Sequence, residues 1–231
     1  MCGRFSLKTS PDTLERIFGR PIPAGYRPRF NVAPTQEVLA LVSDHGETRF
    51  DMLRWGLIPF WARDPSIGNR MINARCETVA ERGPFRDAYQ RRRCLVVADG
   101  FYEWQTRPGG RYPMWVRTAT GEPFAIAGLW ERWRRGPEPI LSCTILTTDA
   151  NPFMARIHDR MPVILGAEEG ERWLAEDAGE AELREILDGA RSVELRAHEV
   201  STLVNNPSND VPECIEPVET VEETLTLPGF E

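Results

Sequence analysis

Short apolar and alternating runs dominate the hydrophobic pattern of this chain, and they predict β-strands rather than long helices. The run Cys94–Ala98 is apolar throughout, which is typical of a strand buried on both faces. Turns at Gly46 and at Gly109-Gly110 separate neighbouring runs. The predicted strands are Cys2–Leu7, Glu37–Val42, Thr48–Leu57, Cys94–Ala98, Tyr112–Arg117, Pro123–Trp133, Leu141–Thr148, Val163–Leu165 and Ser192–Ser201.

Helix signals lie between these strands. Ser10-Pro11 is a helix start, because a capping hydroxyl precedes proline at the first helical position, and Leu14, Ile17 and Phe18 then share one face. Strands and helices without regular alternation favour an α+β fold over a doubly wound sheet. A helical region is predicted over about 76–90, with Pro84 starting a second helix within it, and further helices are predicted over 151–157, 167–176 and 181–187.

The chain of 231 residues fits one large domain, and its 41% hydrophobic content with seven Trp and ten Phe fills a sizeable core. No repeat or linker interrupts residues 1–205, which we predict to be a single domain. Residues 206–231 are rich in Pro and Glu, and we predict an acidic tail that is partly disordered or strapped over the surface.

Several function classes are disfavoured by the composition. The five cysteines are odd in number, widely spaced and without a Cys-x-x-Cys pair, which argues against a disulfide framework and a zinc knuckle. With three scattered histidines and no Gly-rich phosphate loop before a helix, we expect no metal and no cofactor. No apolar run reaches membrane-spanning length and no signal peptide is recognisable, so a cytoplasmic protein is expected.

The net charge of −7 conceals a strong segregation of charge. Residues 1–165 hold 24 Lys and Arg against 17 Asp and Glu, a balance of +7, whereas residues 166–231 hold 4 against 18, a balance of −14. Lys8 is the single lysine, and arginine suits bidentate phosphate contacts and stacking on bases. The first part of the chain is therefore a candidate nucleic-acid surface. The alternative is that the arginines reflect genome composition and are merely solvated.

Cys2 is the first candidate for a reactive residue. If Met1 is removed, this residue carries a free α-amine and a thiol, whose ordinary pKa values of about 8 and about 8.5 leave both partly deprotonated at neutral pH. With an aldehyde, the amine forms an imine and the thiol then closes a thiazolidine ring. A second-position cysteine is otherwise an accident of sequence, so this hypothesis depends on partners downstream.

Three such partners are candidates. Glu103 follows an apolar strand and is flanked by aromatic residues, where burial raises the pKa of a carboxyl as a general acid requires; otherwise it is an exposed glutamate paired with an arginine. His158 is followed by Asp159, which either orients the imidazole or pairs with Arg160. Asn73 lies in an apolar stretch and either donates to a sugar oxygen or caps a helix at residue 76.

A second set of residues suits a nucleic acid. Arginines near the candidate site suit phosphates, a buried asparagine suits a sugar or phosphate oxygen, and tryptophans near strand ends suit stacking on bases, although core packing is the commoner fate of a tryptophan. The predicted DNA-binding residues are Arg4, Asn31, Trp61, Arg75, Trp104 and Arg160.

Taken together, the ordered motifs resemble the SRAP family, the SOS response-associated peptidases or abasic site processing proteins. Each motif alone is weak, but the ordered set from residue 1 to about 205 is specific. The matching pieces are Met1–Phe5, Asn31–Pro34, Trp55–Pro59, Ile72–Arg75, Glu77-Thr78, Ala98–Trp104, Ile157–Pro162, His198–Ser201 and Val204-Asn205.

The resemblance implies a single α+β domain with a distorted β-barrel and peripheral helices, acting as a monomer on single-stranded DNA. It implies that Cys2, freed of Met1, traps the abasic-site aldehyde as a thiazolidine crosslink that shields the lesion, with AP lyase activity as a side reaction. Asn73 would position the sugar, Glu103 would act as acid and base, and His158 would transfer a proton at the sugar oxygen. The six DNA-binding residues would hold phosphates and bases.

Two departures from the family pattern stand out. Ala62 follows Trp61 where some relatives have a second aromatic residue, so base wedging is expected to be weaker here. The acidic extension after residue 205 is longer than the domain needs, and it is a candidate competitor for the basic surface.

Two other functions remain open from the sequence alone. One is an N-terminal-nucleophile peptidase or amidohydrolase in which Cys2 attacks an acyl carbon, consistent with the peptidase role assigned to family members. The other is a single-strand-binding module without covalent chemistry. Convergence of Cys2, Asn73, Glu103 and His158 in space is the structural prediction on which the crosslinking hypothesis rests.

Overall fold

The continuous apolar run predicted as a buried strand forms β6 (Arg93–Ala98), all of whose residues are buried. It lies between β3 (Glu37–Asp44) and β9 (Phe124–Trp133), and both pairings are antiparallel. β4 (Glu47–Trp55) continues the sheet from β3 to β10 (Ile140–Asp149), and β10 pairs in turn with β9. These strands therefore close into a ring.

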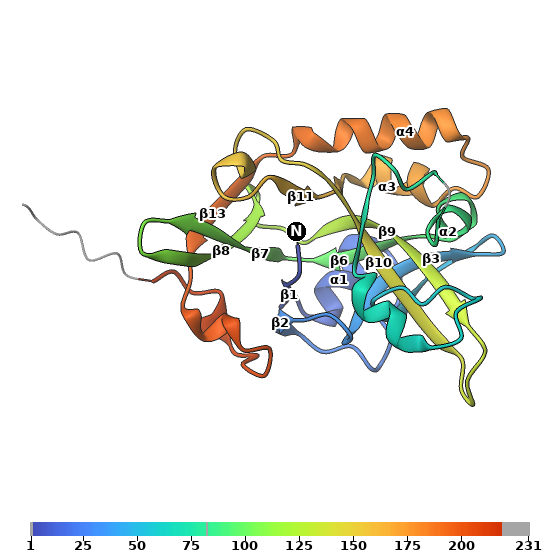
Figure 1. Ribbon diagram of the computed structural model, residues 1–231, viewed down its shortest axis with the longest axis horizontal. Coiled ribbons are helices and arrows are strands. Elements are labelled where there is room, and N and C mark those ends of the chain that lie inside the picture. The colour runs from blue at the N-terminus through green and yellow to red at the C-terminus, as the bar shows by residue number, and fades with distance from the viewer. Residues whose placement is uncertain (1, 82, 219–231) are drawn as a thin grey trace, which may run out of the picture.

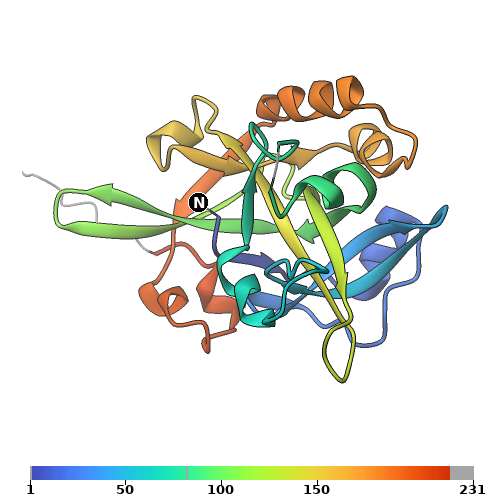
Figure 2. The same cartoon turned by 45° about the vertical axis from the view of Figure 1, so that its right-hand side comes forward.

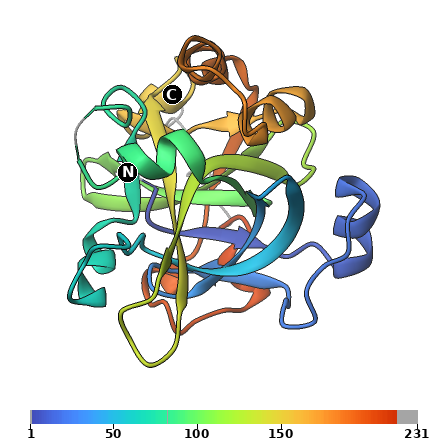
Figure 3. The same ribbon diagram turned by 90° about the vertical axis from the view of Figure 1, so that its right-hand side faces the viewer.

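The computed structural model describes residues 2–81 and 83–218. Alternation along the ring strands sends side chains to two cores on opposite faces. On β3, Val38 and Ala40 join an inner core with Phe5, whereas Leu39 and Leu41 join an outer core beneath the helices. The curvature of β3 and β4 (blue) is visible in Figure 3.

Closure of the ring depends on a close approach at Gly128. A Cβ atom at this position of β9 would lie 2.8 Å from the carbonyl oxygen of Thr144 and 3.0 Å from the Sγ of Cys94. Because both distances are shorter than a normal contact, any side chain here would push β6 and β10 away from β9.

A second, antiparallel sheet covers the inner core, with the order β13-β8-β7-β1-β2. β7 and β8 continue as a long hairpin that projects from the body of the protein (Figures 1 and 2). Its strands are β1 (Phe5–Leu7), β2 (Arg29–Val32), β7 (Gly100–Arg107), β8 (Gly110–Thr118) and β13 (Leu195–Glu199).

Helices cover the outer core. The predicted start at Ser10 is confirmed, since its hydroxyl accepts from the Thr13 N–H, and Gly19 ends the helix in the left-handed conformation with φ 64°. None of the helices within the described residues has the length and apolar character needed to cross a bilayer. The α-helices are α1 (Pro11–Phe18), α2 (Arg86–Arg91), α3 (Ala167–Leu174) and α4 (Glu180–Gly189).

In the helical region predicted over residues 76–90, the first helix is wrong, whereas the second, predicted to start at Pro84, corresponds to α2 (Arg86–Arg91). Residues 76–80 form turns and residue 81 lies in a bend. The chain enters this stretch from β5 (Asn73–Arg75), which pairs with β10, and the Cys76 N–H extends that pairing by donating to the Thr147 carbonyl oxygen at 2.9 Å. The helix predicted over 151–157 shrinks to the 3₁₀ turn η2 (Met154–Arg156). The other short elements are η1 (Pro65–Arg70), β11 (Arg160–Pro162), β12 (Ile164–Leu165), η3 (Ala190–Ser192), η4 (Thr202–Asn205) and η5 (Pro212–Cys214).

The described part of the predicted tail, residues 206–218, is strapped against β2. The Asp210 carboxylate accepts from the N–H groups of Phe30 at 2.6 Å and Asn31 at 2.9 Å, and it pairs with Arg29. Cys214 is fully buried in a small hydrophobic cluster that is separate from the inner and outer cores. Residues 219–231 lie outside the described residues, and the domain boundary at 205 stays a prediction.

The α+β prediction is confirmed. The strands expected to form a distorted barrel form the ring of β3, β4, β6, β9 and β10 together with the second sheet. Strands β2, β7 and β11 were not predicted, because their polar residues hide them in a hydrophobicity pattern.

Candidate active site

Cys2 lies just before β1 and is fully buried in the inner core. β1 is flanked by β2 and β7, so the strand carries the beginning of the chain into the interior (Figure 1). Burial raises the pKa of the Cys2 thiol, and the negative charge of Glu103 raises it further. The thiol therefore keeps its proton at neutral pH.

Glu103 lies on β7, next to β1. Alternation along β7 turns Phe101 and Glu103 to the same face, and Phe101 packs in the inner core. Glu103 is only 2% exposed, so the alternative of an exposed strand-end glutamate is wrong. Burial raises the pKa of its carboxyl, and the positive charges of the amino terminus, His158 and Arg111 offset part of that rise.

The start of β7 needs a residue without a side chain. A Cβ atom on Gly100 would lie 2.5 Å from the indole ring of Trp115, which packs against β7 from the neighbouring β8. The Trp115 Nε1 donates to the hydroxyl of Ser6 on β1 at 2.9 Å. Gly100 therefore allows β1, β7 and β8 to pack closely, and this packing holds Glu103 in the same buried region as Cys2.

Asn73 begins β5 and contacts Cys2 directly. Its Nδ2 donates to the Cys2 carbonyl oxygen at 2.9 Å. Its Oδ1 is buried and has no hydrogen-bond partner among the described residues, so it is available to a ligand. Asn73 does not cap a helix, because no helix begins at residue 76.

His158 lies between η2 and β11, with its Nε2 3.9 Å from Glu103 Oε2. Its Nδ1 accepts from the Arg160 N–H at 3.0 Å, so the proton of the neutral ring is on Nε2, on the side of Glu103. The Asp159 carboxylate lies 2.9 Å from Nδ1, and it can accept a hydrogen bond from the Nδ1–H when the ring is protonated. Asp159 therefore contacts the imidazole, while the ion pairs of Arg160 are with other residues.

One strand gathers two of these residues. β10 pairs on one side with β5, where Ile145 faces Asn73, and it pairs at its end with β11, two residues beyond His158. The structure thus brings together the four predicted catalytic residues: Asn73 touches Cys2, Glu103 acts electrostatically on Cys2, and His158 pairs with Glu103.

Two of the predicted DNA ligands have their polar groups engaged inside the protein. Arg4 donates to Asn31 Oδ1 at 2.8 Å and to the Val204 carbonyl oxygen at 2.6 Å. The Asn31 Nδ2 donates to three carbonyl oxygens of the C-terminal segment, including that of Asn209 at 2.7 Å. Both residues hold this segment on the sheet, and their DNA contacts stay predictions.

Arg160 is also engaged. Its guanidinium makes a two-pronged pair with Glu77, at 2.8 and 2.9 Å, and it contacts Asp149 at 2.6 Å. It also donates to the Thr147 carbonyl oxygen at 2.7 Å. Both Nη atoms already have acceptors and the Nε is buried, so a phosphate would have to share the Nη donors.

The remaining predicted DNA ligands lie nearer to solvent. Arg75 is exposed at the end of β5, two residues beyond Asn73. Trp61 is 47% exposed, whereas Trp104 is half-buried and donates to Asn205 Oδ1 at 2.8 Å. Sequence reasoning missed Phe60, which is as exposed as Trp61 and gives this loop a second aromatic side chain despite Ala62.

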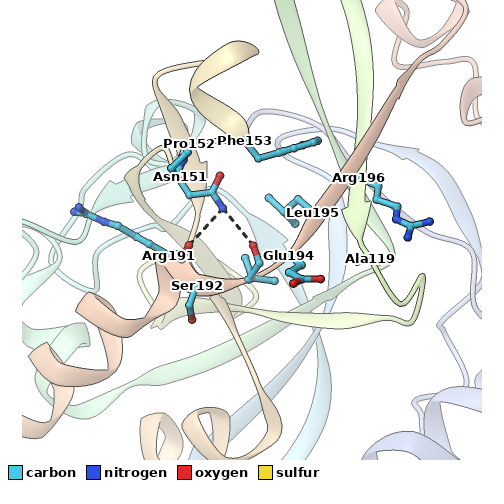
Figure 4. A pocket seen from close by; sticks show the side chains of 10 residues that line it. Ala119, Asn151, Pro152, Phe153, Arg191, Ser192, Glu194, Leu195 and Arg196 are labelled. Atoms are coloured by element: carbon cyan, nitrogen blue, oxygen red, sulfur yellow. Dashed lines mark hydrogen bonds between the residues drawn. The ribbon is translucent and has the colours of Figure 1, made fainter.

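Two cavities lie elsewhere in the protein. One, of about 360 Å³, lies between residues 151–153 and the segment 191–196 (Figure 4). The other, of about 370 Å³, is lined by residues of β1, β2 and β3. Neither is lined by the four candidate residues.

The chain is similar over most of its length to a known protein family and to several of its members. The family model for SRAP, SOS response associated peptidase, matches residues 1–207. The abasic site processing protein YoqW of Bacillus subtilis (strain 168) is 43% identical over 223 residues, which cover 94% of this chain and 99% of the relative. The abasic site processing protein YedK of Escherichia coli (strain K12) is 32% identical, with coverage of 94% and 100%.

A vertebrate relative and a solved structure extend the comparison. The abasic site processing protein HMCES of Gallus gallus is 34% identical, with coverage of 84% of this chain and 67% of the relative. A crystal structure of a protein from Bacteroides thetaiotaomicron superposes with a TM-score of 0.82 at 25% identity, with coverage of 94% and 99%. Fold, ordered motifs and relatives agree, and the chain belongs to the SRAP family, whose relatives named here are abasic site processing proteins.

Proposed function

We propose that this protein binds single-stranded DNA at abasic sites and, after removal of Met1, traps the lesion as a thiazolidine through Cys2. The observation that carries the proposal is the meeting of Cys2 with a buried carboxyl, an imidazole and an amide. Asn73 Nδ2 lies 2.9 Å from the Cys2 carbonyl oxygen, and His158 Nε2 lies 3.9 Å from Glu103 Oε2.

The reaction balances without an oxidant or reductant. The α-amine of Cys2 adds to the aldehyde carbon of the ring-opened sugar, and loss of water gives an imine. Glu103 in its protonated form, which burial favours by raising the pKa of the carboxyl, supplies the proton with which the hydroxyl leaves as water. Its carboxylate then accepts the thiol proton while Sγ bonds to the carbon of the protonated imine. The nitrogen keeps its proton and takes the electron pair of the C=N bond, so it becomes the neutral nitrogen of the closed ring.

Two other groups serve the sugar in this scheme. His158 has one proton to give from Nε2 and can exchange it at the sugar oxygen as the furanose ring opens. The buried Oδ1 of Asn73 can accept from a sugar hydroxyl while Nδ2 holds the Cys2 carbonyl. Ring closure by the thiol removes the imine that would otherwise lead to β-elimination and strand cleavage.

The raised pKa of the Cys2 thiol argues against the peptidase alternative. A cysteine that attacks an acyl carbon needs a thiolate, which requires a lowered thiol pKa. Here burial and the charge of Glu103 both act in the opposite direction. In the proposed reaction the amine attacks first, and the thiol gives up its proton only in the last step.

Exposed residues support the DNA-binding part of the proposal. Phe60 and Trp61 present aromatic faces for stacking, in the loop that connects β4 to the 3₁₀ turn η1. Arg75 lies next to the cluster along β5 and suits a phosphate. The relatives YoqW and YedK are named abasic site processing proteins, which points to the same lesion.

The first prediction separates the amine from the thiol. Cys2→Ala keeps the α-amine and loses the thiol, so it should form no stable crosslink with glycosylase-generated abasic single-stranded DNA on a denaturing gel. Its imine should still be trapped by borohydride, and strand cleavage should increase. The matched control is Cys76→Ala, a half-buried cysteine outside the cluster, which should crosslink like the wild type. An undiminished band in Cys2→Ala would refute the proposal.

The second prediction concerns pH. Because the Glu103 pKa is raised, its protonated form persists above the ordinary value of about 4.3, and the crosslinking rate should fall as pH rises through the raised value. Glu103→Gln should slow crosslinking by about 10²-fold and abolish this fall. Glu131→Gln is the control, since Glu131 is also buried with a raised pKa but pairs with Arg92. Equal pH profiles for Glu103→Gln and the wild type would contradict the assignment.

The third prediction concerns phosphate binding. Arg75→Ala should weaken binding to undamaged single-stranded DNA and make the slope of log K against log salt shallower by about 0.7, the share of one phosphate contact. Fluorescence anisotropy in a Cys2→Ala background measures binding without covalency. Arg91→Ala, at the end of α2, removes an exposed arginine away from the cluster and should leave the slope unchanged. The same slope in both variants would exclude Arg75 as a phosphate ligand.

A further inference from the structure

The turn that carries His158 is fastened to the strand that carries Glu103. Gln105 lies two residues beyond Glu103 on β7, on the same face of the strand. Its Nε2 donates to the Arg156 carbonyl oxygen at 2.6 Å, and Arg156 is the last residue of η2. His158 follows two residues later, so this hydrogen bond links the two elements within a few residues of both side chains.

The far side of the same turn is fixed independently. Asn151 Oδ1 accepts from the Met154 N–H at 2.9 Å, and its Nδ2 donates to the carbonyl oxygens of Arg191 and Val193 (Figure 4). The N–H groups of Ile157 and His158 both donate to the Met154 carbonyl oxygen. The turn is thus a rigid unit anchored by Asn151 on one side and by Gln105 on the other.

This geometry bears directly on proton transfer. The 3.9 Å between His158 Nε2 and Glu103 Oε2 is longer than a hydrogen bond, which needs about 3 Å. A shift of less than 1 Å in the turn therefore decides whether the pair can exchange a proton, and misplacements of that size change rates strongly. Gln105 is placed to limit that shift, because it joins the turn to the Glu103 strand.

We propose that Gln105 is a positioning residue that sets the separation of His158 from Glu103. This proposal rests on the proposed function, because His158 and Glu103 transfer protons only in the proposed reaction at the sugar. It adds a residue that touches neither Cys2 nor the sugar. Its effect on the reaction must pass through His158, and that requirement makes it testable.

Gln105→Met is the main variant, since methionine has the same length and no branch but lacks the N–H donor. It should slow crosslinking by about 10-fold in the wild-type background and by less than about 2-fold in a His158→Ala background. Gln90→Met is the matched control at an exposed position on α2 and should change neither rate. Equal slowing in both backgrounds, or none in either, would overturn the proposal.

A readout without turnover separates this proposal from the proposed function. The charged groups that lower the pKa of the Glu103 carboxyl are the amino terminus, His158 and Arg111, and Glu103 in turn acts on the Cys2 thiol. If Gln105→Met lets His158 move away, the midpoint of the Glu103 carboxyl titration, followed by ¹³C NMR, should rise. It should not rise in Gln90→Met, nor in Gln105→Met when His158 is already alanine.

Each outcome then has one meaning. A wild type that forms no crosslink refutes the proposed function, while the titration still decides the role of Gln105. A wild type that crosslinks, with an unchanged Glu103 midpoint and rate in Gln105→Met, refutes the positioning role alone. Urea unfolding of Gln105→Met and Gln90→Met should give matching midpoints, which shows that the effect is local rather than a loss of fold.

Discussion

Burial of the Glu103 carboxyl beside the Cys2 thiol is the constraint on which the site depends. Removing an ionised carboxylate from water costs several kcal/mol unless its charge is compensated. Burial of Glu103 therefore raises the pKa of its carboxyl, and positive charges that include His158 and Arg111 offset part of that rise. The same burial and the charge of Glu103 raise the pKa of the thiol. Both shifts favour the protonated form of their group, so the carboxyl and the thiol each hold a proton more tightly than they would in water.

The fold supplies this environment through two sheets that share one core. Alternation on β7 places Glu103 on the face that Phe101 uses for packing, and β1 carries Cys2 to the same depth. β10 then brings Asn73 alongside through β5 and fixes the end of the His158 turn through β11. The opposite side of the β1–β2 edge is held by the C-terminal segment, whose anchors include Arg4, Asn31 and Asp210.

The sequence correctly predicted the elements that depend mainly on neighbouring residues, such as the helix start at Ser10 and the buried strand β6. The prediction failed at residues 76–81, where the pairing of Asn73–Arg75 with β10 continues to the Cys76 N–H. The ordered motifs named the four clustered residues, but residue type alone does not reveal a partner. Arg160 was expected at a phosphate and is paired with Glu77, and the link from Gln105 to Arg156 has no sequence signal at all.

The most direct measurement of the central claim is mass spectrometry of the N-terminal peptide from protein crosslinked to abasic single-stranded DNA and treated with iodoacetamide. The account predicts a peptide that begins with Cys2, carries the sugar remnant with the loss of one water, and resists alkylation because nitrogen and sulfur are both in the ring. A remnant on Lys8 or another side chain, or a Cys2 thiol still open to alkylation, would contradict it.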